Sequence, residues 1–397
     1  MKRLRDISDR KIRETPDQFN RFLMEKIDWN ARLIGIDGAR GAGKTTLLLQ
    51  YLKKIYGFAE EAIYLALDDI YFAETALLEF AEEFEKEGGR FLFLDEVHKY
   101  KEWSRDLKLI YDHHQSLQVV FTSSSVLEVY KGSHDLSRRL RLYHLPGLSL
   151  REYALLKYNL ELPVLSLENI LRNHRKISLD LINRIKPIKL WKEYRESGYY
   201  PFFIEDPASY HESLRSILNV ILENDIPAIY QIDFRSVLNL KKLLSIIARL
   251  VPYKPNISNL SRQIGVTWET LLRYLYYLEK AQIVKWLGKD THGINYLNKP
   301  EKIYMHNTNL LYALAEGEVN IGNVRETFFL NQIDVGHAVS YSEKGDFHVD
   351  EKYFFEVGGK GKTTRQISGL KHAYVVQDDI ETGAAIKIPL WLFGLLY

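Results

Sequence analysis

The sequence contains no cysteine, and this absence excludes several kinds of chemistry at once. Without thiols the chain can form no disulfide bond, no cysteine nucleophile and no cysteine-ligated zinc site. It also has no apolar run near the roughly 18 residues that a membrane-spanning helix requires. The amino terminus alternates charges and lacks the apolar stretch of a signal peptide. We therefore expect a cytoplasmic protein that does not cross a membrane.

Neither sign of charge dominates, because 54 Lys and Arg residues stand against 52 Asp and Glu, a formal net charge of +2. So small a net charge argues against a protein that coats nucleic acid by charge alone. Hydrophobic residues make up 46% of the 397 residues, which is enough to form real cores. The length predicts roughly two to three domains.

The first part of the chain alternates short apolar runs with helical stretches. Such runs, when nearly continuous, are typical of parallel strands covered on both faces by helices. Residues 1–155 are therefore predicted to form one α/β domain with a short amphipathic helix before it, based on Phe19, Phe22, Leu23 and Ile27. The five predicted strands are Leu33–Ile36, Ile63–Leu67, Phe91–Leu94, Val119–Phe121 and Leu140–Leu145.

The rest of the chain divides by composition into three further segments. Residues 156–240 are helical and punctuated by proline, so they are interpreted as a connector. Residues 241–305 show short helices around Gly265, a candidate N-cap at Thr267 and a strand pair, the pattern of a winged helix. Residues 306–397 return to strands, at 347–349, 353–357 and 373–376, and are predicted to be mixed α/β.

The strongest motif is a glycine-rich loop between the first strand and a helix, with the pattern GxxxxGK[ST]. Glycines let backbone N–H groups close around phosphates, and the following helix presents its positive end. Lys44 is predicted to reach the β- and γ-phosphates of ATP, and the Thr45 hydroxyl to ligate Mg²⁺. The predicted nucleotide-binding residues here are Gly38, Ala39, Arg40, Gly41, Ala42, Gly43, Lys44, Thr45 and Thr46.

Two carboxylates follow the third predicted strand. Asp95 stands at its carboxyl end, where it can hold the Mg²⁺ shell, and Glu96 is placed to activate a water. Paired acids after a strand often mark only a helix start, but together with the glycine loop they indicate hydrolysis of ATP.

Two weaker signals remain open between alternatives. Thr122 and Ser123 end the fourth strand, where they either contact the γ-phosphate or form a serine-rich turn. Arg138 and Arg139 either neutralise charge in the transition state across a subunit interface or form surface salt bridges.

Together these motifs resemble the prokaryotic AAA-type ATPases that carry a C-terminal domain of unknown function. The resemblance implies a P-loop NTPase sheet with the hydroxyl-bearing strand between the two nucleotide-binding strands, and ATP and Mg²⁺ as cofactors. In this family the strand usually carries Gly-Ser and the arginine motif reads Gly-Arg, so Ser123 and Arg138 occupy glycine positions here. Arg139 inherits the finger-like role, which implies a homo-oligomer.

The resemblance also implies a degenerate restriction-endonuclease-like site in residues 306–397, with acids at Glu326, Asp346 and Glu356. Residues two apart on a strand face the same way, so the expected lysine belongs at position 358, which is Gly358. Lys360, or Lys362, would have to replace it. We therefore expect no efficient DNA cleavage; alternatively, these acids solvate the surface or bind a partner.

The sequence thus favours an ATPase whose hydrolysis switches the arrangement of its winged-helix and nuclease-like domains around an unknown protein client. The alternatives are a nucleotide-regulated DNA-binding module and a metal-dependent nuclease. DNA binding has weak support, because the predicted recognition helix from Thr267 to Lys280 carries only Arg273 and Lys280 as basic residues.

Overall fold

The structure is a computed structural model, and it describes residues 1–123, 136, 138–252, 254–289, 299–315 and 317–397. Ser124 and Ser137, which adjoin predicted motifs, and residues 290–298 of the predicted strand pair lie outside the described residues. The chain divides into two compact units, Met1–Gly147 and Leu148–Tyr397. Within the described ranges, no helix is long and apolar enough to cross a membrane.

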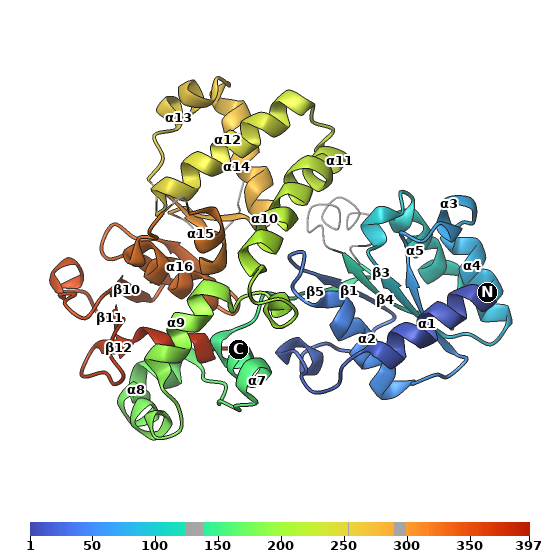
Figure 1. Ribbon diagram of the computed structural model, residues 1–397, viewed down its shortest axis with the longest axis horizontal. Coiled ribbons are helices and arrows are strands. Elements are labelled where there is room, and N and C mark those ends of the chain that lie inside the picture. Colours follow the sequence, from blue (N-terminus) through green and yellow to red (C-terminus); the bar gives the residue numbers. More distant parts are fainter. Residues whose placement is uncertain (124–135, 137, 253, 290–298, 316) are drawn as a thin grey trace. The chain divides into compact units, whose positions relative to one another are not determined.

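The first unit alternates strands and helices (Figure 1), and all five predicted strands are confirmed. Its amino-terminal helix spans Lys2–Glu14 rather than the segment around Phe22, and it buries Leu4, Ser8 and Ile12. One buried residue per turn in a highly charged segment is a weak sequence signal, which explains this error. The elements are α1 (Lys2–Glu14), η1 (Phe22–Glu25), β1 (Leu33–Asp37), α2 (Lys44–Ile55), β2 (Ala62–Ala66), α3 (Tyr71–Glu74), α4 (Leu77–Lys86), β3 (Phe91–Asp95), η2 (Val97–Lys99), α5 (Trp103–His113), β4 (Gln118–Ser123) and β5 (Arg141–His144).

The five strands form one parallel sheet in the order β2-β3-β4-β1-β5. Strand β4, which ends in the hydroxyls, therefore lies between β3 and β1, as the resemblance implied. Asp37 at the end of β1 pairs with Ser123 at the end of β4. The carboxyl ends of β1, β3 and β4 thus meet at one edge of the sheet, where ligands bind in open α/β folds.

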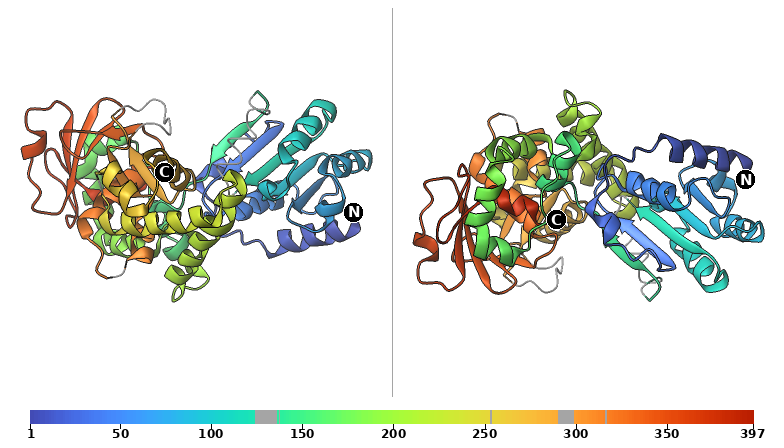
Figure 2. Two further views of the ribbon diagram at one scale, coloured as in Figure 1. Left: turned by 90° about the horizontal axis from the view of Figure 1, so that it is seen from above. Right: turned by 90° about the horizontal axis from the view of Figure 1, so that it is seen from below.

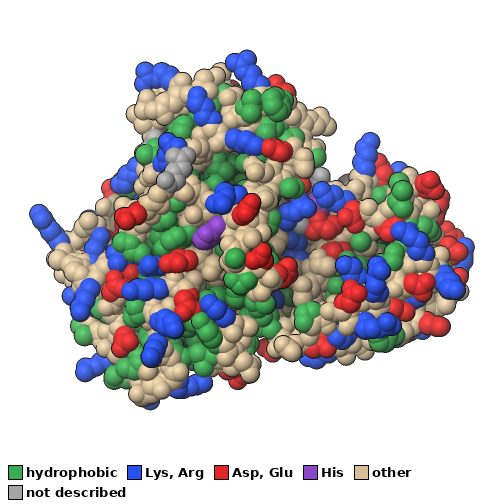
Figure 3. Space-filling model, in the orientation of Figure 1, with side chains coloured by type: hydrophobic (Ala, Val, Ile, Leu, Met, Phe, Trp, Pro, Cys, Tyr) green, Lys and Arg blue, Asp and Glu red, His purple; other side chains and the backbone are tan. Residues whose placement is uncertain are grey.

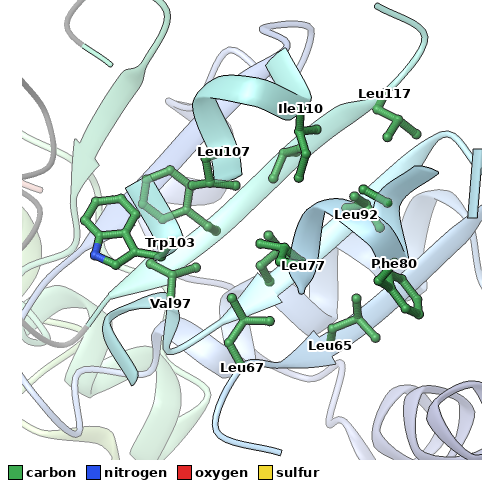
Figure 4. Close-up of a cluster of buried hydrophobic side chains, with 14 of the residues drawn as sticks. Leu65, Leu67, Leu77, Phe80, Leu92, Val97, Trp103, Leu107, Ile110 and Leu117 are labelled. Carbon is green, nitrogen blue, oxygen red and sulfur yellow. The ribbon is translucent and has the colours of Figure 1, made fainter. Parts of the chain in front are cut away.

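Helices cover both faces of this sheet, as Figure 2 shows from two sides. On one face, α4 and α5 pack on the strands through a cluster that includes Leu77, Phe80, Leu107 and Ile110 (Figure 4). On the other face, α2 and η1 pack through a second cluster of buried side chains, among them Leu48. These two cores fix β1 and α2, and so fix the loop between them.

The second unit begins with α7, which carries a full capping box at Ser149. The Ser149 hydroxyl donates to the carbonyl of Tyr397 at 2.7 Å, so α7 is fastened to the last residue of the chain. The predicted domain limit at residue 155 falls inside α7, and the division into four segments stays a prediction. The helices of this unit before its first strand are α7 (Leu150–Tyr158), α8 (Leu167–Ile182), α9 (Pro187–Ser197), η3 (Pro201–Ile204), α10 (Tyr210–Val220), η4 (Ile221–Asp225), α11 (Ile226–Tyr230), α12 (Phe234–Leu250), α13 (Ile257–Ile264) and α14 (Trp268–Lys280).

Helices α13 and α14 agree with the prediction for residues 258–281. The Thr267 side chain caps α14 by accepting from the Thr270 N–H, which confirms the predicted N-cap, and Gly265 ends α13 at a φ of 82°. Strands β6 (Val284–Leu287) and β7 (Lys302–Met305) follow as an antiparallel pair.

The remaining residues form a mixed five-stranded sheet in the order β12-β11-β10-β9-β8, with α16 packed on β10. Its three predicted strands are present, and β8 and β12 add one strand at each edge. The elements are α15 (Thr308–Leu314), α16 (Ile321–Ile333), β8 (Val339–Tyr341), β9 (Phe347–Val349), β10 (Tyr353–Gly358), η5 (Arg365–Ile367), β11 (Ala373–Gln377), β12 (Lys387–Pro389) and η6 (Leu390–Leu395).

Candidate nucleotide-binding site

The glycine loop joins β1 to α2 in a backbone conformation that needs its glycines. Gly41 and Gly43 have φ values of 84° and 93°, which residues with a side chain rarely adopt. A Cβ atom on Gly38 would lie 2.3 Å from the Leu145 carbonyl oxygen, so no side chain fits there. The loop is therefore held in a fixed form by the end of β5.

Lys44 begins α2 and turns its side chain back into the loop. Its ammonium donates to the carbonyls of Gly38 at 2.9 Å and Ala39 at 3.0 Å, and the residue is buried. Burial lowers the pKa of Lys44, and the nearby carboxylates of Glu96 and Asp95 oppose that shift. The first turn of α2 carries no acidic residue, so its positive end and Lys44 together form a site for an anion.

Asp95 ends β3 and is buried among three hydroxyl groups. Thr45 and Tyr64 each donate to its Oδ2 atom at 2.9 Å, and Thr122 donates to Oδ1. Sequence analysis missed Tyr64, although a polar ring inside the aliphatic strand β2 was an available signal. Burial first, then the charge of Asp95, raises the pKa of the Tyr64 phenol. Thr45 and Asp95 provide adjacent oxygen ligands of the kind that Mg²⁺ prefers.

Glu96 lies directly after the strand in a left-handed backbone conformation, with a φ of 52°. Its N–H donates to the Thr122 hydroxyl at 3.1 Å, and its carboxylate Oε2 lies 3.3 Å from Nε2 of His98. The Glu96 side chain is 23% exposed, so water can reach it. A strained residue held by its neighbours is common at functional sites.

The other residues predicted to contact nucleotide surround this centre. Ser123 is fully buried at the end of β4, Ala39 and Ala42 are buried in the loop, Arg40 is half-buried, and Thr46 is exposed in the first turn of α2.

A further residue of the site, Arg21, was not recognised in the sequence. It is buried, and its guanidinium donates to the Ala42 carbonyl at 2.6 Å and to the Pro146 and Gly147 carbonyls at 2.7 and 2.9 Å. Arg21 therefore ties the glycine loop to the last residues of the first unit. A lone arginine before a 3₁₀ turn gives no sequence signal for this role.

Arg139 does not contact the glycine loop in the structure. Its guanidinium donates to both carboxylate oxygens of Asp112 on α5, at 2.8 and 2.9 Å, which raises the pKa of Arg139 and lowers that of Asp112. The arginine is thus anchored in the same chain, as the surface salt-bridge alternative requires.

The acids of the predicted nuclease-like site do come together in the second unit, but lysines accompany them. Lys302 Nζ lies 2.6 Å from Glu326 Oε2 and 3.6 Å from Asp346 Oδ1. Glu356 is fully buried and pairs with Lys362. Burial raises the pKa of both Glu326 and Glu356, and the nearby charge of Asp346 adds to each shift.

Lys362, and not Lys360, reaches this cluster. A Cβ atom on Gly358 would lie 2.6 Å from Cδ and 2.8 Å from Cγ of Lys362, so the Lys362 stem fills the space of a side chain at position 358. Lys360 is exposed. Among the residues that the structure describes, no group of three or more Asp, Glu or His side chains is arranged to hold a metal ion.

Two different family models match the chain, one within the first unit and a short way beyond it, and the other within the second unit. A family model described as an AAA domain matches residues 30–154. A model described as a domain of unknown function (DUF8612) matches residues 188–320. No curated protein matches the chain. Residues 30–154 are therefore similar to an AAA domain, and residues 188–320 to a domain of unknown function.

Several solved structures are similar at low identity. A Walker-type ATPase of Pyrococcus abyssi is 13% identical, with 78% of this chain and 95% of that chain covered at a TM-score of 0.40. AMPPCP-bound DnaA of Aquifex aeolicus is 16% identical, with 65% and 84% covered at a TM-score of 0.25. The Hsp104–ADP complex of S. cerevisiae is 15% identical, with 70% and 39% covered at 0.29.

Proposed function

We propose that the first unit binds ATP with Mg²⁺ at the loop Gly38–Thr45 and hydrolyses it with Glu96 as the base. One observation carries this proposal: Asp95, Thr45 and Lys44 converge at the carboxyl edge of the sheet, with Glu96 next to them. Hydroxyl groups orient a carboxylate without placing a positive charge on it, so a metal ion can join it. This is the chemistry that a metal–nucleotide complex needs.

Each residue has a separate part in the proposed reaction. Lys44 and the loop N–H groups neutralise and orient the phosphates, while Thr45 and Asp95 would hold Mg²⁺, which supplies further positive charge. Glu96 takes a proton from a water whose oxygen forms a bond to the γ-phosphorus. The bond from that phosphorus to the bridging oxygen breaks, and ADP and inorganic phosphate are the products.

The test is the variant Glu96→Gln, which removes the base and keeps the shape. We expect ATP affinity to change little and turnover to fall about a hundredfold or more. Glu83→Gln on α4 is the matched control, because Glu83 is exposed in the same unit. Hydrolysis at the native rate by Glu96→Gln would show that Glu96 is not the base.

We further propose that hydrolysis switches the arrangement of the C-terminal winged-helix and nuclease-like domains, and that Arg139 acts across subunits of a homo-oligomer. For Arg139 this requires exchange of its partner Asp112 for a phosphate in a neighbouring site. Mixing Arg139→Ala protein with Glu96→Gln protein tests it, since one mixed interface would then have both groups intact. We expect partial recovery of turnover. If a mixed oligomer forms and shows no recovery, Arg139 does not act across subunits and only pairs with Asp112.

For the second unit we propose that the acidic cluster does not cleave DNA efficiently, for a reason other than the one the sequence suggested. The expected lysine is replaced in space by Lys362, but Lys362 and Lys302 pair with the carboxylates. The residues as arranged do not fit a bound metal ion. Plasmid cleavage with Mg²⁺ or Mn²⁺ that is lost in Glu356→Ala would refute this.

DNA binding by α13 and α14 is the alternative to a scaffold role for these helices. On the face shown in Figure 3, Lys and Arg side chains are interspersed with Asp and Glu over most of the molecule, but they predominate over the part that α12 to α14 form. Helix α14 buries Leu271, Leu272, Leu275 and Leu278, which supports a packing role for much of this helix.

A further inference from the structure

One side chain joins Glu96 to the end of the neighbouring strand. His98 lies in the turn η2 after β3, and its side chain is only 5% exposed. Its Nε2 atom is 3.3 Å from Glu96 Oε2, and its Nδ1 atom is 3.4 Å from the Ser123 hydroxyl oxygen. A neutral imidazole with its proton on Nε2 presents a donor toward the carboxylate and an acceptor toward the hydroxyl. The contacts therefore form a chain from β4 to Glu96.

The same strand also holds the backbone of Glu96. The Thr122 hydroxyl accepts from the Glu96 N–H at 3.1 Å, while Glu96 keeps a left-handed φ of 52°. Two successive residues of β4 thus hold Glu96. Thr122 holds its backbone, and Ser123 contacts His98, which in turn contacts the Glu96 carboxylate. A carboxylate held at two ends has fewer orientations, and proton transfer in a reaction depends strongly on orientation.

We propose that His98 is a positioning residue that aims the Glu96 carboxylate, and that Ser123 acts on the reaction through His98. This inference rests on the proposed function, because it requires Glu96 to be the base. In this proposal Ser123 has a role in the reaction other than contact with phosphate, and it is more than part of a serine-rich turn. His98 itself does not touch the reacting atoms in this assignment.

The experiment measures kcat and KM for ATP, and the affinity for a non-hydrolysable ATP analogue, in a set of variants. His98→Ala should lower kcat about tenfold or more and leave KM and analogue affinity within about twofold. His98→Gln should retain most of the turnover, because an amide can donate to Glu96 and accept from Ser123. His113→Ala, at an exposed histidine on α5, is the matched control and should behave as wild type.

A double-mutant cycle tests the link to Ser123. Because the two residues form one chain, His98→Ala should cost little further turnover in the Ser123→Ala background. Independent, additive losses would overturn the link. An unchanged kcat in His98→Ala, a loss of analogue affinity equal to the loss of turnover, or a His98→Gln protein as impaired as His98→Ala would overturn the positioning role.

The outcome also separates this inference from the proposed function. If Glu96→Gln hydrolyses ATP normally, the base itself is misassigned and both proposals fail. If Glu96→Gln is impaired and His98→Ala is not, only the inference fails. In the Glu96→Gln background, His98→Ala should have no further effect on turnover, since no carboxylate remains to be aimed.

Discussion

The two units treat buried carboxylates in opposite ways. In the first unit, Asp95 accepts from three neutral hydroxyls, those of Thr45, Tyr64 and Thr122. In the second unit, Glu326 and Glu356 are each paired with a lysine. Hydroxyls orient a carboxylate and leave its charge in place, whereas an ammonium group cancels it. Two clusters of acids therefore have different capacities for a cation.

This difference makes the partners of an acid more informative than the acid itself. A cation can join Asp95 without displacing another charge, but at Glu326 or Glu356 it must first displace Lys302 or Lys362. A pair of buried opposite charges is costly to separate. The following variants each remove an acid, or a partner of an acid or of the phosphates, in one of the two units, from the largest expected effect to the smallest.

The largest effect is expected from Lys44→Ala. Lys44 is the buried cation of the glycine loop, and its loss leaves the loop N–H groups and the end of α2 to hold the phosphates beside Asp95 and Glu96. We expect ATP affinity to fall by about 4 kcal/mol, close to a thousandfold. Calorimetric titration with ATP and Mg²⁺ measures it. Lys54→Ala, at an exposed position of the same helix, should bind normally; near-native affinity in Lys44→Ala would remove the loop as the phosphate site.

In the second unit the corresponding change is Lys302→Met. The Lys302 side chain is 12% exposed, and its loss removes the cation paired with Glu326 and near Asp346. We expect the free energy of unfolding to fall by about 3 kcal/mol in urea denaturation. Lys371→Met, at an exposed lysine, serves as the control. A stable Lys302→Met protein would show that these acids need no lysine and would weaken the comparison.

Glu279 on α14 is a carboxylate of the second unit whose pKa is shifted mainly by burial. Burial raises its pKa to about 7, although Lys285 and Lys280 oppose the shift. A raised pKa in the folded state means stability that is present in acid and lost as the pH rises toward 7. Glu279→Gln should therefore raise the unfolding free energy by about 2 kcal/mol at pH 8 and change it little at pH 4. Equal effects at both pH values would contradict the assignment.

Much of the fold was predictable because local signals and tertiary structure agree. The strands β1 to β4 are nearly continuous apolar runs, and Thr267 and Gly265 mark helix ends through side-chain and backbone chemistry that acts over a few residues. The helix α1 was predicted at the wrong place because only Leu4, Ser8 and Ile12 of this charged segment are buried. Its burial depends on long-range packing that no local pattern records.

The site divides in the same way. Residues that need a special backbone or a fixed spacing, such as Gly38, Lys44 and Asp95, were recognised from the motif. Tyr64 and Arg21 were not, because each reaches its partner across the fold, by 31 residues to Asp95 and by 125 to Pro146. The sequence could not decide between Lys360 and Lys362. Only the folded backbone at Gly358 and Gly359 shows that the Lys362 side chain occupies the space beside position 358.

The smallest effect is expected from Tyr64→Phe, which removes one of the three hydroxyls on Asp95. Because Thr45 and Thr122 remain, the carboxylate keeps most of its orientation, and we expect ATP affinity in the presence of Mg²⁺ to fall by about 1 kcal/mol, roughly fivefold. Tyr56→Phe, at the opposite end of α2 from Thr45, is the matched control and should not change affinity. If hydroxyls only orient Asp95, the loss of binding free energy in Tyr64→Phe is far smaller than the loss of unfolding free energy in Lys302→Met. A loss of binding free energy of about 3 kcal/mol would mean that the Tyr64 phenol acts on Asp95 as strongly as an ammonium group does, and the distinction between the two units would be wrong.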